Sequence, residues 1–256
     1  VPLVKAKIEQ LAQAIMTGKN CVVFTGAGIS TESGIPDYRS QGGIWDQFRP
    51  VYFDEFMASK ESRVEYWRQK EELYNDLRKA KPNAAHLAVA AQYQGGFVQA
   101  VITQNIDGLH QQAGIPDEDV IELHGSNRRV RCMSCLEISS IHAAHLRIKS
   151  GDLAPECTCG GYLKPDTVSF GQSMPAVELQ RAVTLSNTCA VFIVVGSTLL
   201  VQPAALLPDY ARRAGAFLAI VNLSQTPYDG ICNVLIQEKA GVALPEIASR
   251  ISQLHA

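Results

Sequence analysis

The sequence predicts an α/β protein built on a doubly wound parallel β-sheet that carries two insertions. Short apolar runs recur along the chain without alternation of polar and apolar residues, which is typical of strands buried on both faces. Helical segments separate several of these runs, and strands that alternate with helices form βαβ units. Two stretches, 41–82 and 128–165, break this rhythm and are interpreted as insertions.

The regular elements can be placed in chain order. Apolar residues recur at helical spacing over 3–16, and Gly18 supplies the stop. The strands of the main sheet are expected at 21–24, 97–102, 120–123, 190–195, 216–221 and 233–236. Further helices are expected at 84–94, 176–185, 203–215 and 244–254.

The two insertions differ in composition. The stretch 41–82 is rich in aromatic and charged residues and contains a predicted helix at about 59–80, whereas 128–165 holds four paired cysteines. We therefore expect a main domain formed by 1–40, 83–127 and 166–256, a helical insertion at 41–82, and a small metal-binding domain at 128–165.

Composition limits the classes of function. The 256 residues are 46% hydrophobic and 19% charged, and the net charge of −2 gives no electrostatic basis for binding nucleic acid or an anionic membrane. Charged residues interrupt the first ten positions, so no secretory signal is expected. The most apolar stretch, 189–207, is divided into runs too short to span a bilayer. We expect a cytoplasmic protein, and its oligomeric state stays open.

Four of the seven cysteines form two close pairs in the second insertion. Cys132 and Cys135 are arranged as Cys-x-x-Cys, and Cys157 and Cys159 as Cys-x-Cys. Without a secretory signal, paired thiols favour a metal over disulfides, and four thiolates predict one structural Zn²⁺ ion. Free surface thiols or a redox pair are the alternatives.

A glycine-rich turn follows the first predicted strand directly. Gly26 and Gly28 would let the backbone approach a pyrophosphate closely, and a following helix would point free N–H groups at it. Thr31 occupies the place of the third glycine in the usual dinucleotide fingerprint. On this segment alone, an ordinary strand-to-helix turn is an equal alternative.

Polar residues follow the second and third predicted strands. Gln104, Asn105 and Asp107 come after the second strand, and His124 comes after the third. Ligands of doubly wound sheets bind at the carboxyl ends of the strands, where these side chains could bind a carboxamide or a ribose. An imidazole also titrates near neutrality, as a general base requires. An Asx turn and a structural histidine are the alternatives.

A longer string makes the assignment specific. Residues 26–39, Gly-Ala-Gly-Ile-Ser-Thr-Glu-Ser-Gly-Ile-Pro-Asp-Tyr-Arg, closely resemble the signature loop of the sirtuin family. Further motifs follow in the family's order, at 103–110, 123–125, the two cysteine pairs, 168–171, 196–199 and 222–224. The resemblance covers nearly the whole chain. It implies a Rossmann-like domain that binds NAD, a zinc ribbon, and NAD-dependent removal of acetyl or related acyl groups from protein lysines.

The resemblance also implies which residues bind NAD. Gln104 would touch a ribose, Asn105 and Asp107 would hold the nicotinamide amide, and Asn105 would also be catalytic. The residues expected to bind NAD are Gly26, Ala27, Gly28, Ser30, Thr31, Asp37, Tyr38, Arg39, Gln104, Asn105, Ile106, Asp107, Gly196, Ser197, Thr198, Asn222, Leu223 and Ser224.

The implied reaction assigns the remaining roles. The acyl oxygen attacks the ribose carbon as nicotinamide leaves, and His124 then accepts a proton from a ribose hydroxyl. His86 is expected to serve packing and His110 to orient its loop. An acylated peptide would add as a strand between two segments. The residues expected to contact it are Val168, Ser169, Phe170, Gly171 and Val201.

The sequence departs from the family pattern at the second cysteine pair and near the expected peptide-binding segments. Only Thr158 separates the second cysteine pair, so His142 or His145 could replace one thiol. Gln172 and Gln202 replace a common Glu and a common aromatic residue, which could alter peptide preference.

Two other functions stay open. One is an NAD-dependent ADP-ribosyltransferase, and the other is a sensor that binds without releasing nicotinamide.

Overall fold

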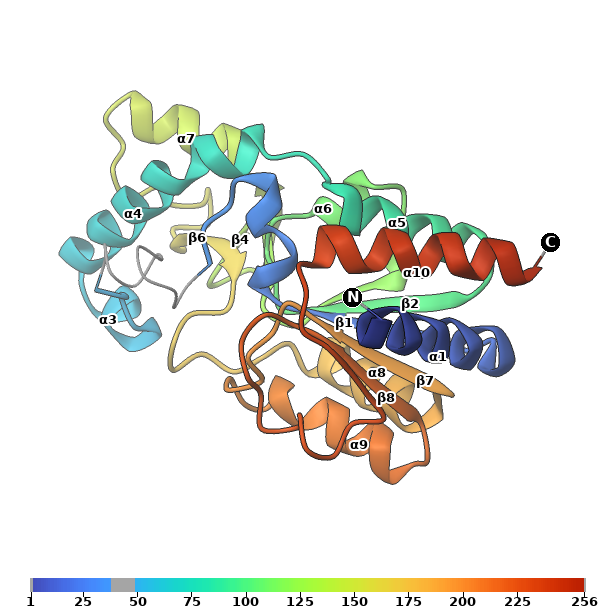
Figure 1. Ribbon diagram of the computed structural model, residues 1–256. Helices are drawn as coiled ribbons and strands as arrows, with labels where there is room; N and C mark the ends of the chain where they lie inside the picture. Colours follow the sequence, from blue (N-terminus) through green and yellow to red (C-terminus); the bar gives the residue numbers. More distant parts are fainter. Residues whose placement is uncertain (1, 38–48, 256) are drawn as a thin grey trace.

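The computed structural model describes residues 2–37 and 49–255, and its largest feature is a six-stranded parallel sheet (Figure 1). The spatial order is β3-β2-β1-β7-β8-β9. This confirms the predicted fold class, and every predicted strand is present. The strands are β1 Cys21–Thr25, β2 Val98–Thr103, β3 Val120–Glu122, β7 Val191–Val195, β8 Phe217–Val221 and β9 Val234–Ile236.

Helices cover both faces of this sheet, as Figure 1 shows. Helices α1 Pro2–Gly18, α5 Ala84–Gln94 and α10 Ala240–His255 pack on one face, and α8 Ala176–Thr188 and α9 Leu207–Arg213 pack on the other. Successive side chains of a strand therefore pack alternately into the apolar cores on the two faces of the sheet. Burying one large apolar side chain stabilises the folded state by about 1.5–3 kcal/mol. Apolar residues are therefore favoured on both faces, and each strand appears in the sequence as a continuous apolar run.

Most helices follow the predicted ranges, with differences at their ends. Helix α5 begins as predicted, because the side chain of Asn83 accepts hydrogen bonds from the N–H groups of Ala85 and His86. The stretch predicted as one helix at 203–215 is instead a 3₁₀ turn, Ala204–Leu206, followed by α9. Helix α10 begins at Ala240 rather than at 244. Among the described residues, no helix combines the length and apolar character needed to cross a membrane.

A second, antiparallel sheet lies beside the first and has the order β5-β4-β6. Its strands are β4 Gly125–Cys132, β5 Ile138–Ser140 and β6 Leu163–Thr167, and α7 Ile141–Lys149 packs against it. Figure 1 shows α7 at the end of the molecule that lies away from both termini.

Helices α3 Phe53–Ala58 and α4 Lys60–Lys79 occupy the same end (Figure 1). The side chain of Ser59 accepts a 3.0 Å hydrogen bond from Ser62 N and caps α4. Trp67 and Tyr74 of α4 share an apolar cluster with the small sheet and α7, and Trp67 Nε1 donates to Leu163 O at 3.1 Å. The long helix is thus fixed to the small sheet.

The strand order creates a topological switch between β1 and β7. The chain runs outward from β1 through β2 to β3 and later returns to place β7 on the other side of β1. Ligands bind at such a point, beyond the carboxyl ends of the strands. Here the two loops touch, since Gly26 N donates to Val195 O at 3.0 Å and Gly28 N donates to Gly196 O at 2.9 Å.

Only glycine allows the two loops to approach this closely. A Cβ atom on Gly28 would lie 2.8 Å from Cα of Gly196, and a Cβ atom on Gly196 would lie 2.3 Å from Ile29 N. Gly196 also has a φ of +63°, in the left-handed region that disfavours residues with a side chain. The close contact between the two loops therefore depends on these glycines and does not require a bound ligand.

The substitution Gly196→Ala is expected to lower the free energy of unfolding by about 1–3 kcal/mol, because the new methyl group both strains the backbone and meets Ile29. Denaturant unfolding measures the change. Gly230→Ala is the matched control, since its Cβ would have no atom within 4 Å, and it should stay within about 0.5 kcal/mol of the parent. Equal stability of the two variants would contradict the close approach.

Candidate active site and metal centre

A cavity of about 1020 Å³ opens at the carboxyl edge of the parallel sheet. Its wall includes the turn after β1, the loop after β2, His124 beyond β3, the turn after β7 and the loop after β8. Helix α4 and the segment that follows β6 complete the wall. This volume is at the upper end of the range for small-molecule sites, so it can hold an extended ligand.

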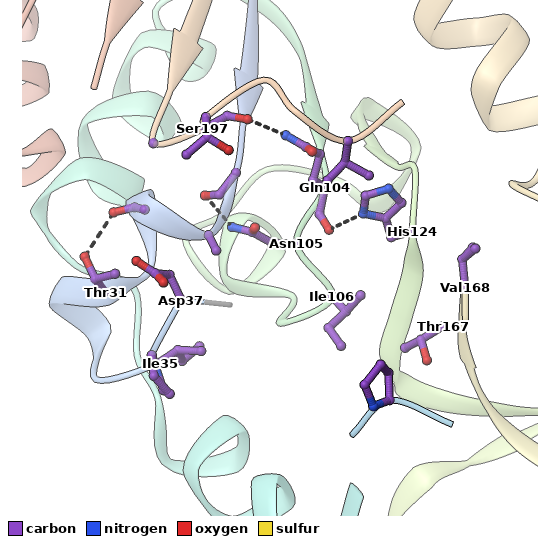
Figure 2. Close-up of a pocket in the computed structure, with 18 of the residues that line it drawn as sticks. Thr31, Ile35, Asp37, Gln104, Asn105, Ile106, His124, Thr167, Val168 and Ser197 are labelled. Atoms are coloured by element: carbon purple, nitrogen blue, oxygen red, sulfur yellow. Dashed lines mark hydrogen bonds between the residues drawn. The ribbon is translucent and has the colours of Figure 1, made fainter. Parts of the chain in front are cut away.

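His124 lies in this cavity next to Gln104 (Figure 2). Its Nδ1 atom is 3.0 Å from the backbone oxygen of Gln104, and only a protonated Nδ1 can donate to a carbonyl. A neutral imidazole then carries its lone pair on Nε2, which can accept a proton. The side chain of Gln104 donates to Ser197 Oγ at 2.8 Å and so links the loops after β2 and β7.

Asn105 is held beneath the glycine-rich turn. Its Nδ2 donates to Gly26 O at 3.1 Å and to Ser30 Oγ at 3.2 Å. Ser30 Oγ in turn donates to Asp107 Oδ2 at 2.7 Å, and Asp107 Oδ1 accepts from Leu109 N at 2.9 Å. Burial raises the pKa of Asp107, and the hydrogen bonds from Leu109 and Ser30 offset part of that rise. The network fixes the amide of Asn105 between the turn and His124, as Figure 2 shows.

Most residues expected to bind ligands border this one cavity, including all five expected to contact a peptide. Ser30 and Asp107 do not border it, because their side chains bond to each other beneath the turn. Tyr38 and Arg39 lie outside the described residues. The expected NAD-binding residues that border the cavity are Gly26, Ala27, Gly28, Thr31, Asp37, Gln104, Asn105, Ile106, Gly196, Ser197, Thr198, Asn222, Leu223 and Ser224.

The segment after the glycine-rich turn differs from the prediction. In place of an α-helix, 3₁₀ turns occupy Ala27–Ile29 and Thr31–Ser33, and Gly34 ends them with a φ of +83°. Several N–H groups are bonded locally, since Ser30 N donates to Ala27 O at 3.0 Å. The contact with Gly196 bends the chain here, so the expected helix N-terminus is absent from residues 26–37.

The cavity also reaches residues of α4 that are not among the expected binding residues. Tyr66, Gln69, Lys70 and Leu73 of α4 border it. They recur at intervals of three and four residues, as one face of a helix does. That spacing was visible in the sequence, but only the fold shows that this face turns toward the cavity.

Two histidines to which no role in the chemistry was assigned, His86 and His110, are buried and do not border the cavity. Their rings, on His86 and His110, lie 5.0 Å apart. Thr25 Oγ1 donates to Thr103 Oγ1 at 2.8 Å and so accepts from His110 Nε2, at 3.0 Å. Asn105 N donates to the same Thr103 oxygen at 3.0 Å. His110 thus ends a buried chain of hydrogen bonds that leads to Asn105, which supports its expected role in orienting this loop.

The four paired cysteines converge at one point. Their sulfur atoms all lie within 4.8 Å of one another, with Cys132 Sγ 3.5 Å from Cys159 Sγ and Cys135 Sγ 3.8 Å from Cys157 Sγ. Tetrahedral zinc with bonds of about 2.3 Å needs sulfur atoms about 3.8 Å apart, so the cluster fits one Zn²⁺ ion.

The neighbouring histidines have other partners. His145 Nδ1 contacts the carboxylate of Glu71, and its ring stacks on Tyr74 with 3.6 Å between centroids. His142 Nδ1 lies 3.0 Å from the hydroxyl of Tyr74. These contacts favour four cysteines, rather than three cysteines and a histidine, as the ligand set.

We expect the purified protein to hold one zinc ion per chain, and Cys159→Ser to lose it and to unfold at a lower temperature. The metal would join the end of β4 to the loop that carries the second pair, which explains the loss of stability. Elemental analysis and thermal unfolding give the two readouts. Cys232 lies outside the cluster, so Cys232→Ser serves as the control and should keep the metal. A full zinc content in Cys159→Ser would contradict the assignment.

Acid should destabilise the protein through the buried histidines. Burial lowers the pKa of His86 to about 4, and burial together with His86 lowers that of His110 to about 3. In the unfolded chain both groups titrate near 6.5. Their depressed values leave stability intact above 6.5 and remove it as the pH falls toward the folded values, by up to about 1.4 kcal/mol per pH unit for each histidine.

The unfolding free energy of the parent protein should fall between about pH 6.5 and pH 5. In His86→Gln this fall should be smaller, because one of the two buried histidines no longer contributes to it. Denaturant titrations across this range measure the slope. His255→Gln, at the exposed end of α10, serves as the control and should keep the parent slope. An unchanged slope in His86→Gln would show that this imidazole does protonate in the folded state.

Comparisons with known proteins agree with this geometry. A model of the Sir2 family matches residues 26–203. The NAD-dependent protein deacetylase 1 of Bradyrhizobium diazoefficiens is 46% identical over 241 residues, which cover 94% of each chain. A solved complex of a Sir2 homologue with NAD is 33% identical, with a TM-score of 0.87 over 97% of this chain and 95% of that one. A solved structure of Sir2 with a p53 peptide and NAD⁺ is 36% identical, with a TM-score of 0.82 over 96% and 97%. The chain therefore belongs to the Sir2 family.

Proposed function

We propose that this protein is an NAD-dependent protein-lysine deacylase that removes acetyl or related acyl groups and yields free lysine, nicotinamide and O-acyl-ADP-ribose. One observation carries the proposal: His124, Asn105 and the glycine-rich turn border a single cavity at the switch point of a parallel sheet. Membership of the Sir2 family and the name of the Bradyrhizobium relative support it.

NAD fits the end of the cavity formed by the loops of the parallel sheet. Gly26 and Gly28 border the cavity there, and Gly28 is partly exposed, so a pyrophosphate could approach the backbone of the turn closely. Asn222 and Ser224, at the end of β8, would contact the adenosine ribose. When bound, NAD supplies the ribose carbon that takes up the acyl oxygen and the nicotinamide that leaves.

His124 is the general base in this proposal. Its Nδ1–H is directed to Gln104 O, so the imidazole accepts the proton of a ribose hydroxyl at Nε2. Asn105 is held by Gly26 and Ser30, so its amide can orient the nicotinamide without reorganising. These residues supply proton transfer and orientation.

The acylated peptide would enter between the main domain and the two insertions, whose proposed bounds are 41–82 and 128–165. The five residues expected to contact it, Val168, Ser169, Phe170, Gly171 and Val201, all line the cavity. The peptide would add as a strand between them, so that backbone hydrogen bonds supply affinity with little demand on its sequence.

Zinc has a structural role in this proposal, because all four sulfur atoms of the cluster would be ligands and no position would stay open. A cytoplasmic location is also part of the proposal, since thiolate ligands persist where thiols are kept reduced.

The substitution His124→Ala tests the function. We expect it to lower kcat for NAD-dependent deacetylation of an acetyl-lysine peptide by roughly 10²–10⁴-fold, because a general base is lost. His255→Ala, far from the cavity, is the control and should keep parent activity. Undiminished turnover in His124→Ala would refute the assigned base.

Acyl dependence separates this function from ADP-ribosyl transfer. A deacylase releases nicotinamide only when an acylated peptide is present, because the acyl oxygen is the nucleophile. Nicotinamide release that is independent of the acyl group would favour the transferase, and NAD binding without any release would favour a sensor.

A further inference from the structure

Tyr66 lies where α4, β6 and the expected peptide-binding segment 168–171 meet. This residue is only 5% exposed. Its hydroxyl oxygen lies 3.2 Å from Thr167 Oγ1 and accepts a 3.4 Å hydrogen bond from Ser169 Oγ. One buried hydroxyl thus contacts both the last residue of β6 and a residue within the segment.

Two ammonium groups flank the ring of Tyr66. The Nζ atoms of Lys70, on α4, and Lys164, on β6, each lie 5.2 Å from its centroid. Lys164 is fully buried, and its ammonium donates to the backbone oxygen of Thr167. From α3, Phe56 packs its ring edge-on against Tyr66 at 5.1 Å and adds no charge.

A buried ammonium is costly unless a negative group lies nearby. Asp166 is the acidic side chain nearest to Lys164 in sequence, but its two oxygens accept hydrogen bonds from Arg129 and Arg131. The phenol of Tyr66 is therefore well placed to compensate the charge of Lys164.

The positive charges of Lys70 and Lys164 both favour the ionised form of the Tyr66 phenol. Burial alone would raise the pKa of Tyr66, but Lys70, Lys164 and the hydrogen bonds from Ser169 and Thr167 outweigh it and lower the pKa to about 7. Burial also lowers the pKa of Lys164. An ionised phenol accepts hydrogen bonds from both hydroxyls, whereas a neutral phenol has a proton of its own to donate.

The segment that Tyr66 holds also touches the catalytic side of the cavity. Val168 N donates to the backbone oxygen of His124 at 2.9 Å. Helix α4 is itself fixed from an adjacent face, about 80–100° around the helix from Tyr66, where Trp67 and Tyr74 pack in the cluster with the small sheet. Tyr66 therefore joins an anchored helix to a segment adjacent to the base.

We propose that Tyr66 is a positioning residue for peptide binding, whose hydroxyl oxygen holds Ser169 and keeps the backbone of 168–171 in the conformation that receives the acylated peptide. This role rests on the proposed function, which assigns that segment to the peptide. Lys164 and Lys70 favour the ionised phenol, so the hydrogen bond that Tyr66 accepts from Ser169 strengthens as the pH rises through neutrality.

The substitution Tyr66→Phe removes only the hydroxyl. We expect the KM for an acetyl-lysine peptide to rise about tenfold at about pH 8, as for loss of a hydrogen bond to a charged group, and to rise less at about pH 6. The KM for NAD and kcat should stay near parent values. Tyr74→Phe is the matched control, because it removes a hydroxyl from the same helix at a position that does not border the cavity, where the partner is His142.

Ser169→Ala removes the other partner of the same hydrogen bond and carries the test if Tyr66→Phe does not fold. It should raise the peptide KM similarly, and the double variant should be no worse than either single variant. A peptide KM unchanged in Tyr66→Phe at both pH values, or fully additive effects, overturns the role of Tyr66 alone. Parent protein without acyl-dependent nicotinamide release overturns the proposed function, and this role with it.

Discussion

Contact between the backbones of two loops, one after β1 and one after β7, is the constraint on which the site depends. All strands of a parallel sheet end at the same edge, so distant parts of the chain converge there. The 2.9 Å hydrogen bond from Gly28 N to Gly196 O leaves no space for a side chain between the loops. Asn105 then binds Gly26 O from the other side, and the backbone oxygen of Gln104 receives the imidazole of His124. The chemistry of the cavity thus follows from close backbone packing.

The part of the molecule beyond the main sheet combines metal binding with a small shared core. The small sheet buries few apolar side chains of its own, and two large members of its cluster, Trp67 and Tyr74, come from α4. The cysteine cluster joins the end of β4 to the loop between α7 and β6, where an apolar core would be too small to hold it. Because an adjacent face of α4 borders the cavity, this helix connects the metal-binding region to the wall of the active site.

The main sheet was predictable from the sequence because burial on both faces leaves a local pattern, a short run of apolar residues, in every strand. The places of His124 and Asn105 after strand ends were predictable for a related reason, since both follow such runs, but their expected roles came from the resemblance to sirtuins. The 3₁₀ turns after Gly28 were not, because they depend on hydrogen bonds to a loop far away in the chain. The pairing of Ser30 with Asp107 and the burial of Tyr66 beside Lys164 likewise arise from tertiary packing, which has no counterpart in local spacing.

The central claim is that His124 and the glycine-rich turn face the same bound dinucleotide. A crystal structure with a non-reactive carbocyclic analogue of NAD tests this most directly. The account predicts a diphosphate against residues 26–31 and a ribose hydroxyl within about 3.2 Å of His124 Nε2. An analogue bound outside the cavity, or a ribose turned away from the imidazole with the diphosphate in place, would contradict it.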